Sequence, residues 1–465
     1  MNWIKPTIAT LLLTALYAVV QAQTTYHRFS MQQTLDYGLK NAVQVRNALL
    51  DIKSQEQTNR EITAAAFPQI NGGISSTYNF SIAVQTLPNF ISPATYQVLV
   101  DEGVKDGNGN PIKFPEEGFG NIQAQFGVPW IAGAGVELSQ ILFDGQVFVG
   151  LQARSASIEY ATKNAEVTVE QIKANIYKVY WQLVAAEIQL NTLQSNIDRF
   201  DKLLHDTKLI YENGFAEKLD VDKVSVQLNN LQTEKIKLES QLKNGNTSLK
   251  FLINMPQKDT LLLTDTLTEE IIKDNLLAEY NYNDRKEIQL LNAAIKLNEY
   301  NIKRYQLSRI PTIVAFASYQ KNAQRLKFDF FNKGDWFTAS LAGIKISIPI
   351  FDGFARRARI ENARISLQKT TNTLEQTKGL MDYEVATAHT QMTNALLTLD
   401  NQRRNIDLAE SVFNSTKKKY EQGLGDNQEI YNAQTELKVA QNNFFGALYD
   451  AITAKVDYLR ATGKL

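Results

Sequence analysis

The side chains that most often carry enzyme chemistry are scarce in this sequence. The chain has no cysteine, which excludes disulfides, thiolate metal sites and nucleophilic thiols. His27, His205 and His389 are the only histidines, and none has a second ligand at metal-binding spacing. Residues 133–135, Gly-Ala-Gly, open no helix and so form no dinucleotide-binding loop. We therefore expect no enzyme activity, no cofactor and no metal site.

One segment resembles the start of a calcium-binding loop. Residues 106–110 read Asp-Gly-Asn-Gly-Asn, and Glu117 stands at the twelfth place of such a loop. Pro111 occupies the sixth place, where the sharp turn of the loop needs glycine. We favour a tight hairpin turn over a calcium site at this segment.

Two carboxylates follow glycine-containing turns at the same spacing. Asp220 stands six residues after Gly214, and Glu429 stands six residues after Gly423. Each lies at the start of a long helical pattern, where the helix dipole favours an acidic side chain. Taken alone, these residues are typical of solvated carboxylates at a helix start.

The bulk charge and the N-terminus bear on partners and location. Lysine plus arginine and aspartate plus glutamate both number 49, so no basic footprint for nucleic acid is present. Lys5 precedes the mostly apolar stretch Ile8 to Val20, about 13 residues, which is typical of a signal-peptide core and too short to span a bilayer. We expect residues 1–22 to be a signal peptide that is cleaved after Ala22.

The rest of the chain contains an internal duplication. Residues 142–145, Leu-Phe-Asp-Gly, recur at 350–353 as Ile-Phe-Asp-Gly, and residues 211–214, Tyr-Glu-Asn-Gly, recur at 420–423 as Tyr-Glu-Gln-Gly. Both recurrences have nearly the same offset, whereas Phe67-Pro68 recurs much later than that offset predicts, as Ile310-Pro311. The first copy therefore carries an insertion of roughly 35 residues between its two strand segments. We expect a first repeat over 23–260, a connecting segment over 261–281 and a second repeat over 282–465.

Each copy contains two segments with period-two alternation, which predicts strands. We expect them at about 69–85 and 131–143 in the first copy, and at about 311–321 and 337–351 in the second. In the first strand Ile70, Ile74 and Tyr78 fall on one face, and the opposite face is polar. Such alternation is typical of a barrel wall between lipid and water. A soluble sandwich with one wet face is the alternative that these strands leave open.

Each copy also contains two long helical segments with a seven-residue apolar repeat. We expect helices at 145–211 and 215–252, and at 353–419 and 426–461. In the first helix the repeat is carried by Ile176, Val179, Leu183, Ala186, Leu190, Leu193, Ile197, Phe200, Leu204 and Tyr211, with Thr207 as a polar position. A helix of about 65 residues would be about 100 Å long. The helices alone would also fit a structural coiled coil without a pore.

The number of strands decides how a membrane barrel could form. Four strands cannot close a barrel, and an open sheet in lipid would leave unpaired backbone groups that cost several kcal/mol each. Three chains would supply twelve strands, which lies within the known range of membrane barrels. The sequence therefore predicts a mixed α and β membrane protein: a trimeric 12-stranded β-barrel, with four strands per chain, continued by a barrel of long α-helical coiled coils.

At this point the sequence resembles the TolC-like family of outer-membrane efflux proteins over essentially its whole mature length. Residues 143–145 and 351–353, both Phe-Asp-Gly, resemble the strand-to-helix corners of the family. Residues 283–288 resemble the segment that opens its second repeat, with Lys286 where proline is usual, and 458–463 resemble its C-terminal end. The resemblance implies a homotrimer in the bacterial outer membrane, a helical tunnel through the periplasm, and a mixed belt around the tunnel that includes the connecting segment.

The resemblance also implies partners and site residues. The expected partners are a periplasmic adaptor, also called a membrane fusion protein, and an inner-membrane transporter of the RND or ABC type. The turns between paired helices match the tips that contact adaptor hairpins. These tip residues are Gly214, Phe215 and Ala216 in the first copy, and Gly423, Leu424 and Gly425 in the second.

The same tips are expected to form the gate of the pore. Glu429 falls where the family places an acidic ring, and Asn432 falls where a second acidic ring would lie. Asp220 and Tyr420 match a pair that helps to hold the closed state, and Gly425 stands where an arginine partner is found in the best-known member. We therefore expect a gate with a single ring of carboxylates and an incomplete lock.

The predicted function is an outer-membrane channel of a tripartite efflux or type I secretion system. The alternative is an exported coiled-coil protein with a structural or adhesive role, which leaves the duplicated amphipathic strands unexplained. The inserted segment, residues 87–129, is expected to lie outside the cell, because the long loops of such barrels face outward.

Overall fold

The computed structural model describes residues 25–267, 272, 280–332, 334–422 and 424–465. The predicted signal peptide, residues 1–22, and part of the predicted connecting segment, 261–281, lie outside the described residues. The chain divides into two compact units. The helical unit comprises the residues up to 59, 152–302 and 360–465, and the strand unit comprises 60–151 and 303–359.

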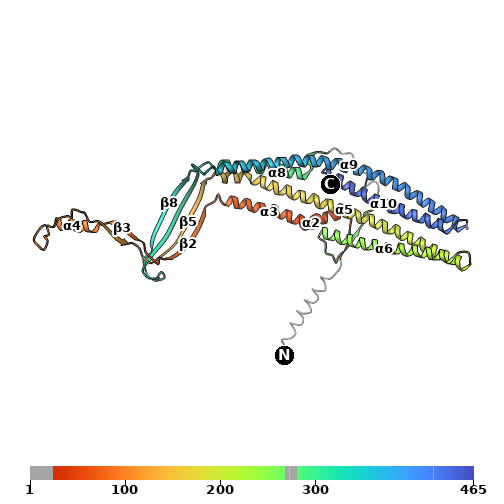
Figure 1. Cartoon of the computed structure of the whole chain (residues 1–465), viewed down its shortest axis with the longest axis horizontal. Helices are drawn as coiled ribbons and strands as arrows, with labels where there is room; N and C mark the ends of the chain where they lie inside the picture. Colours follow the sequence, from red (N-terminus) through yellow and green to blue (C-terminus); the bar gives the residue numbers. More distant parts are fainter. Residues whose placement is uncertain (1–24, 268–271, 273–279, 333, 423) are drawn as a thin grey trace, which may run out of the picture. The chain divides into compact units, whose positions relative to one another are not determined.

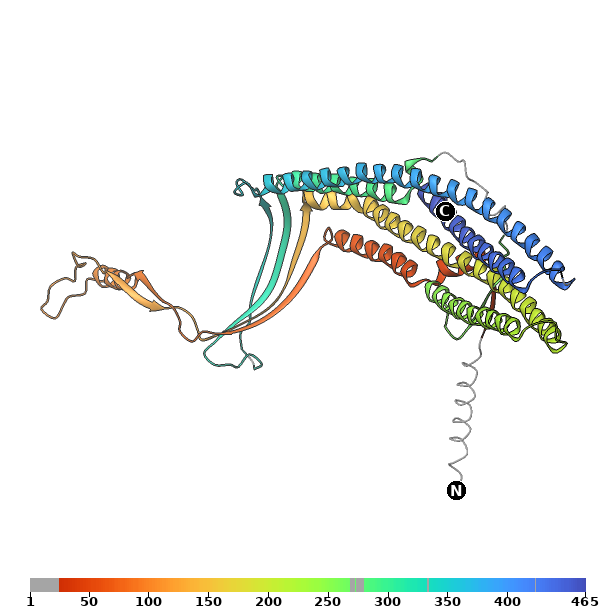
Figure 2. The same cartoon turned by 45° about the vertical axis from the view of Figure 1, so that its right-hand side comes forward.

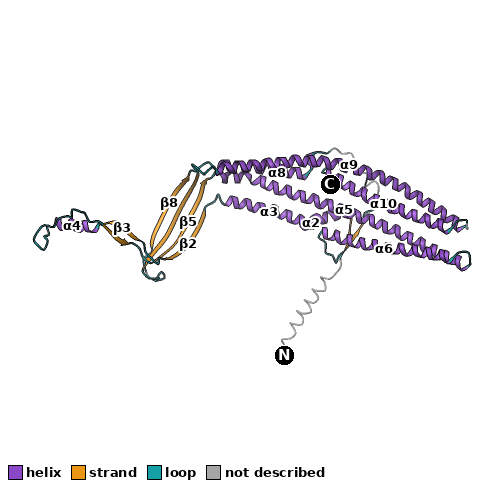
Figure 3. Ribbon diagram, in the orientation of Figure 1, coloured by secondary structure: helices purple, strands orange, loops and turns teal. Residues whose placement is uncertain are grey.

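Long helices dominate the structure (Figure 3). The two longest are α5 (Gly145–Glu212) and α9 (Ala355–Glu421), with 68 and 67 residues. Each is followed by a 35-residue helix, α6 (Lys218–Leu252) or α10 (Asn427–Ala461). Figures 1 and 2 show α5 beside α6 and α9 beside α10. Shorter helices include α2 (Met31–Asn41), α3 (Val43–Ala64), α8 (Lys286–Leu307) and a 3-10 turn, η1 (Tyr282–Asp284).

The heptad pattern explains how these helices pack. In α5 the predicted positions Ile176, Leu183 and Phe200 are at most 3% exposed. Thr207, the polar position in the repeat, is also fully buried, and its hydroxyl donates to the Leu203 carbonyl at 2.8 Å. The pattern fails at Tyr211, which is 43% exposed and lies one residue before the end of α5 at Glu212.

A small parallel sheet belongs to the helical unit. β1 (Tyr26–Phe29) pairs with β6 (Thr260–Leu263), with Tyr26 opposite Thr260. The buried Tyr180 hydroxyl of α5 donates to the Phe29 carbonyl at 3.1 Å. Part of the predicted connecting segment therefore pairs with the start of the described chain against the helical core.

The strand unit contains a four-stranded antiparallel sheet with the order β2-β5-β7-β8. Its strands are β2 (Gln69–Tyr78), β5 (Trp130–Phe143), β7 (Thr312–Arg325) and β8 (Phe337–Ser347). The first strand ends at Tyr78 and not near 85, because Tyr78 pairs with Trp130, the first residue of β5, and no partner strand continues beyond it. The last strand likewise ends at Ser347 and not near 351.

The register divides the sheet into two chemically different faces. Residues opposite one another in neighbouring strands point to the same side, and consecutive residues alternate. The apolar face includes Ile70, Ile74, Val136, Leu138, Ala317, Ala342, Ile344 and Ile346. The polar face includes Asn71, Ser75, Glu137, Ser318, Gln320, Asn322 and Lys345. The alternation seen in separate strands thus forms two continuous surfaces, and Ile74 on the apolar face is 91% exposed.

The insertion in the first copy has secondary structure of its own. β3 (Val84–Pro88) pairs with β4 (Asn121–Gln125), and α4 (Ile91–Asp101) lies between them in the sequence. The segment 106–110 forms a tight turn in which the Asp106 carboxylate accepts from the backbone amides of Asn108 and Asn110, both at 2.9 Å. The Asp106 carboxylate thus accepts hydrogen bonds from the backbone of its own turn, in agreement with the predicted tight turn. None of the helices in the described ranges has the length and apolar character needed to cross a membrane.

Candidate functional site

The first predicted tip is the turn between α5 and α6. Asn213 and Gly214 end α5 through hydrogen bonds to the carbonyls of Leu209 and Tyr211, at 3.2 and 2.9 Å. Gly214 has a φ of +82°, a conformation in which glycine carries no steric penalty. Phe215 follows and is 86% exposed. The turn therefore presents an aromatic side chain at its end that the subunit itself does not cover.

Asp220 has a local structural role at this tip. Its carboxylate accepts a hydrogen bond from the Glu217 backbone amide at 3.2 Å, and the Glu217 side chain caps α6 in return. This reciprocal arrangement satisfies amides that the helix start would otherwise leave unpaired. Tyr420, its predicted partner in the gate, makes no hydrogen bond to Asp220 within the described part of a single chain.

The second predicted tip joins α9 to α10. Leu424 is 78% exposed, and Gly425 packs closely on the backbone of Tyr420, where an added Cβ would come within 3.2 Å of the Tyr420 nitrogen. Asp426 caps α10 by accepting from the Gln428 amide at 3.3 Å. Gly423 lies outside the described residues. Phe215 and Leu424 are the most exposed large apolar residues of the two tips within the described ranges.

The two predicted ring positions lie on the exposed surface at the start of α10. Glu429 is in the first turn and exposed, and it has no ion pair among the described residues. Asn432 is one turn further on, and its side-chain oxygen accepts a hydrogen bond from the Gln428 side-chain amide at 3.0 Å. Because Asp426 already caps the helix, Glu429 is not needed as the cap. The Glu429 carboxylate is therefore exposed to solvent at the tip.

A cavity of about 230 Å³ lies directly behind the second tip, between α5 and the α9–α10 pair. Tyr420 lines it together with apolar side chains and with a set of charged residues. The charged lining residues are Arg199, Lys202, Asp206, Lys417 and Glu421. The guanidinium of Arg199 lies over the Phe413 ring, 5.9 Å from its centroid. Tyr420 therefore faces α5 of its own chain in an environment with excess positive charge.

A buried amide contact lies further from the tips, between α5 and α10. The Asn196 amide donates to the Gln441 side-chain oxygen at 2.6 Å, and the two residues are 2% and 7% exposed. Burial of a polar group is costly unless it is hydrogen-bonded, so the contact favours one alignment of the two helices. Heptad reasoning placed only apolar side chains in this interface and missed the pair.

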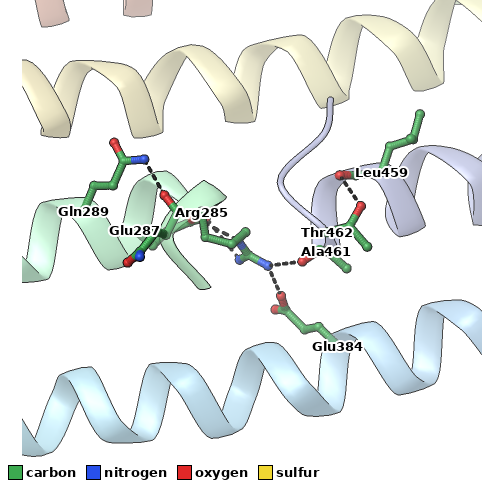
Figure 4. Close-up of polar contacts among 8 residues, drawn as sticks. Arg285, Glu287, Gln289, Glu384, Leu459, Ala461 and Thr462 are labelled. Atoms are coloured by element: carbon green, nitrogen blue, oxygen red, sulfur yellow. Dashed lines mark hydrogen bonds and ion pairs between the residues drawn. The ribbon is translucent and has the colours of Figure 1, made fainter. Parts of the chain in front are cut away.

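The two sequence motifs at the ends of the second repeat meet in space (Figure 4). Arg285, at the start of α8, donates to Glu287 at 3.0 and 3.2 Å and to Glu384 of α9 at 2.8 Å. It also donates to the Ala461 carbonyl at 3.3 Å. Gly463 has a φ of +72°, and a Cβ there would lie 3.0 Å from the Asp284 carbonyl carbon. We call Arg285, Glu287, Glu384 and Ala461 the arginine hub.

The hub is electrostatically stable because its charges are paired. Burial alone would raise the pKa of Glu287, but its hydrogen bonds and charge interaction with Arg285 outweigh burial and hold this pKa below its usual range. Burial likewise opposes the charged form of Arg285, whose pKa is nevertheless raised by Glu287 and Glu384. The motif resemblance identified both segments but gave no signal that they touch.

The comparisons with known proteins agree with this architecture. Residues 282–464 match the model of the outer membrane efflux protein family. "Protein CyaE" of Bordetella pertussis is 22% identical over 71% of this chain and 70% of its own length. "Outer membrane protein TolC" of Vibrio cholerae is 18% identical over 71% of this chain and 76% of its own length. The solved outer membrane protein VceC of Vibrio cholerae has the same fold, with a TM-score of 0.67, 14% identity, and coverage of 93% of this chain and 96% of that one.

These findings first define a class, that of outer-membrane channel proteins with a helical part in the periplasm. Within that class, residues 282–464 match the outer membrane efflux protein family, and the relatives of the chain include TolC of Vibrio cholerae. The resemblance drawn from the motifs is thereby confirmed. The roles of the tip and ring residues stay predictions.

Proposed function

We propose that this protein is the outer-membrane component of a tripartite export system, a homotrimer that passes substrates from a periplasmic pump complex to the exterior. The observation that supports it most directly is the two-faced sheet with open edges. Among the strands that the structure describes, β2 and β8 are the edges of this sheet, so each retains a row of unpaired backbone groups. Pairing β8 with β2 of the next chain satisfies both edges and closes a barrel of twelve strands from three chains.

In this arrangement the apolar face contacts lipid and the polar face lines the pore. Ile70 and Ile344 are 69% and 65% exposed in the single chain, an exposure that lipid would cover. Glu137 and Lys345 on the polar face would contact water in the lumen. A soluble structural coiled coil offers no use for such a divided sheet.

The helix-pair tips are the proposed contact site for a periplasmic adaptor. Phe215 and Leu424 are exposed at the two tips and supply apolar anchors. The cavity behind the second tip adds a recess that is lined by both apolar and charged side chains. The inner-membrane partner would be a transporter of the RND or ABC type. Both efflux and protein secretion are compatible with this architecture.

The proposed pore constriction is a ring of Glu429 from three chains, at the start of α10. Three carboxylates around a narrow opening would raise the local cation concentration and bind multivalent cations. Asn432 supplies no second ring, so block by such ions should be weak. In the closed state, Asp220 and Tyr420 would help to hold the tips together. The contact would form either between these two residues or with residues of neighbouring chains.

The oligomeric state and the pore are tested in one preparation. Mass measurement of the full chain in detergent should give a trimer. In a planar bilayer, Glu429→Gln should lower cation selectivity and relieve block by a trivalent cobalt ammine. Asn432→Asp should strengthen both, because it restores a second ring. Glu410→Gln, which removes an exposed carboxylate from α9, is the matched control and should change neither.

Two results would contradict this proposal separately. A folded monomer that retains its β content would exclude the shared barrel. An intact trimer whose selectivity and block are unaffected by both Glu429→Gln and Asn432→Asp would keep the barrel and exclude the assigned constriction.

A further inference from the structure

A loop of aromatic residues folds over one end of the sheet. Residues 326–336 join β7 to β8, and Phe330 in this loop is 9% exposed. Phe330 packs with Ala132 and Ala323, which are opposite one another in the register. Both alanines belong to the apolar face, so the loop covers that face and leaves the polar face open. We call the described residues of this loop, 326–332 and 334–336, the aromatic flap.

Aromatic contacts and one arginine hold the flap in place. The rings of Phe328 and Phe330 are 5.4 Å apart, and the ring of Phe328 is 4.8 Å from that of Trp130 in β5. Arg325, the last residue of β7, donates to the Asp335 carbonyl at 2.9 Å and pairs with Asp329 at 3.4 Å. The guanidinium thus links Asp329, in the first half of the flap, to Asp335, near its end. The described residues of the flap are thus tied to the sheet and present aromatic side chains.

Lys321 is an unusual residue on the same face, next to the flap. It lies two residues before Ala323 in β7 and is opposite Ala134 and Thr338, so its side chain belongs to the apolar face. It is exposed and makes no ion pair in the described ranges. The four strands place no carboxylate on this face. Among the described residues, no strand side chain on this face therefore offsets the lysine charge.

We propose that Lys321, assisted by the exposed Lys327 of the flap, binds the phosphate groups of a lipid headgroup in the outer leaflet. The acyl chains of this lipid would lie along the apolar face below the flap. The inference rests on the proposed function, because it needs the apolar face to contact lipid. It goes further by assigning a specific class of lipid, a phosphorylated one, to a specific place on the barrel wall.

The height of Lys321 supports this assignment. Strands in such barrels rise about 3.3 Å per residue and tilt by about 45°, so Lys321 lies roughly 21 Å above Thr312, the first residue of β7. The apolar band of these barrels is about 25 Å tall. Lys321 is therefore near the outer boundary of the band, where its stem can remain in the apolar layer while its ammonium reaches the headgroups.

Other occupants fit these observations less well. A neighbouring subunit would pair at β2 or β8, whereas Lys321 lies on β7, which has a strand of its own chain on each side. A free phosphate ion would use the lysine charge but not the flap, in which Leu326 and Phe331 are 76% and 91% exposed. A lipid matches both the charge and the apolar surface.

The proposal is tested by native mass spectrometry of the detergent-solubilised trimer, titrated with diphosphoryl lipid A or with the same lipid after enzymatic dephosphorylation. The wild-type protein should retain the phosphorylated lipid preferentially. Lys321→Gln should weaken this retention about fivefold, the effect of one basic residue at an anionic surface. Lys345→Gln is the matched control, because Lys345 lies in the same sheet but on the polar face.

The possible outcomes separate the alternatives. Equal retention of the two lipids by the wild type, or unchanged retention in Lys321→Gln, would overturn the proposal. An equal loss in Lys345→Gln, or displacement of the lipid by excess inorganic phosphate, would also overturn it. The same spectra report the mass of the trimer, and bilayer recordings of the same samples report the pore. Loss of the lipid site is therefore distinguishable from failure of the proposed function.

Discussion

Replacement of Arg285 in the arginine hub should loosen the end of α10. Arg285→Met keeps the length of the side chain and removes four hydrogen bonds to Glu287, Glu384 and Ala461. Removing one partner of a buried ion pair costs about 3–5 kcal/mol. The side chains of Glu287 and Glu384 are 32% and 39% exposed and recover water, which reduces the expected cost to about 2–3 kcal/mol.

Hydrogen exchange of the backbone amides measures this cost locally. At about 1.4 kcal/mol per tenfold change, the amides of 458–464 should exchange roughly 30- to 150-fold faster in Arg285→Met than in the wild type. Arg285→Lys should give a smaller increase, because lysine keeps the charge and loses the planar fork. Arg404→Met, at an exposed position of α9, should leave these amides unchanged. Wild-type exchange rates in Arg285→Met would refute a stabilising role for the hub.

Three further predictions concern the hub and the insertion. Gly463→Ala should lower the thermal unfolding temperature, because Gly463 has a φ of +72° and an added Cβ would press on the Asp284 backbone; Gly446→Ala, with open space in α10, should raise it slightly. Because the pKa of Glu287 is lowered in the folded state, its stabilising contribution is complete above the ordinary glutamate pKa of about 4.3 and is lost as the pH falls through the folded pKa. Glu287→Gln should thus destabilise the protein at pH 7 but not below the folded pKa, as thermal unfolding at both pH values would show. An epitope tag at Gly107 should be accessible to antibody on intact cells, and accessibility only after rupture of the outer membrane would reverse the predicted topology.

Much of the local structure follows from short-range rules that the sequence displays. Asp144 accepts from the Gln146 amide at 2.7 Å, and α5 begins at Gly145, as the Phe-Asp-Gly corner predicts. Heptad positions such as Leu437 are fully buried because a period of three and four residues keeps them on one side of the helix. These features depend on residues within one or two turns of each other.

Features that depend on distant partners were less predictable. The alternation continues past Tyr78 to Val84, yet the strand stops where its partner β5 begins, and Val84 pairs in a different hairpin. A charged side chain such as Arg285 is expected at the surface from sequence alone. Arg285 is nevertheless buried, because Glu287 of α8 and Glu384 of α9 pair with its charge. Local pattern contains no information on which distant residue completes a contact.

The buried amide pair between α5 and α10 limits how the tips can move. A slide of either helix along its axis would separate Asn196 from Gln441 and leave two buried amides unpaired, whereas a rotation about their contact preserves the 2.6 Å hydrogen bond. The pair therefore acts as a pivot. The 14 residues from Gln441 to Asn427 form a lever arm of about 21 Å, so a rotation of about 10° displaces the tip by about 4 Å. Glu429 lies about 18 Å from Gln441 along α10, so the same rotation would shift it by about 3 Å, roughly the width of a water molecule.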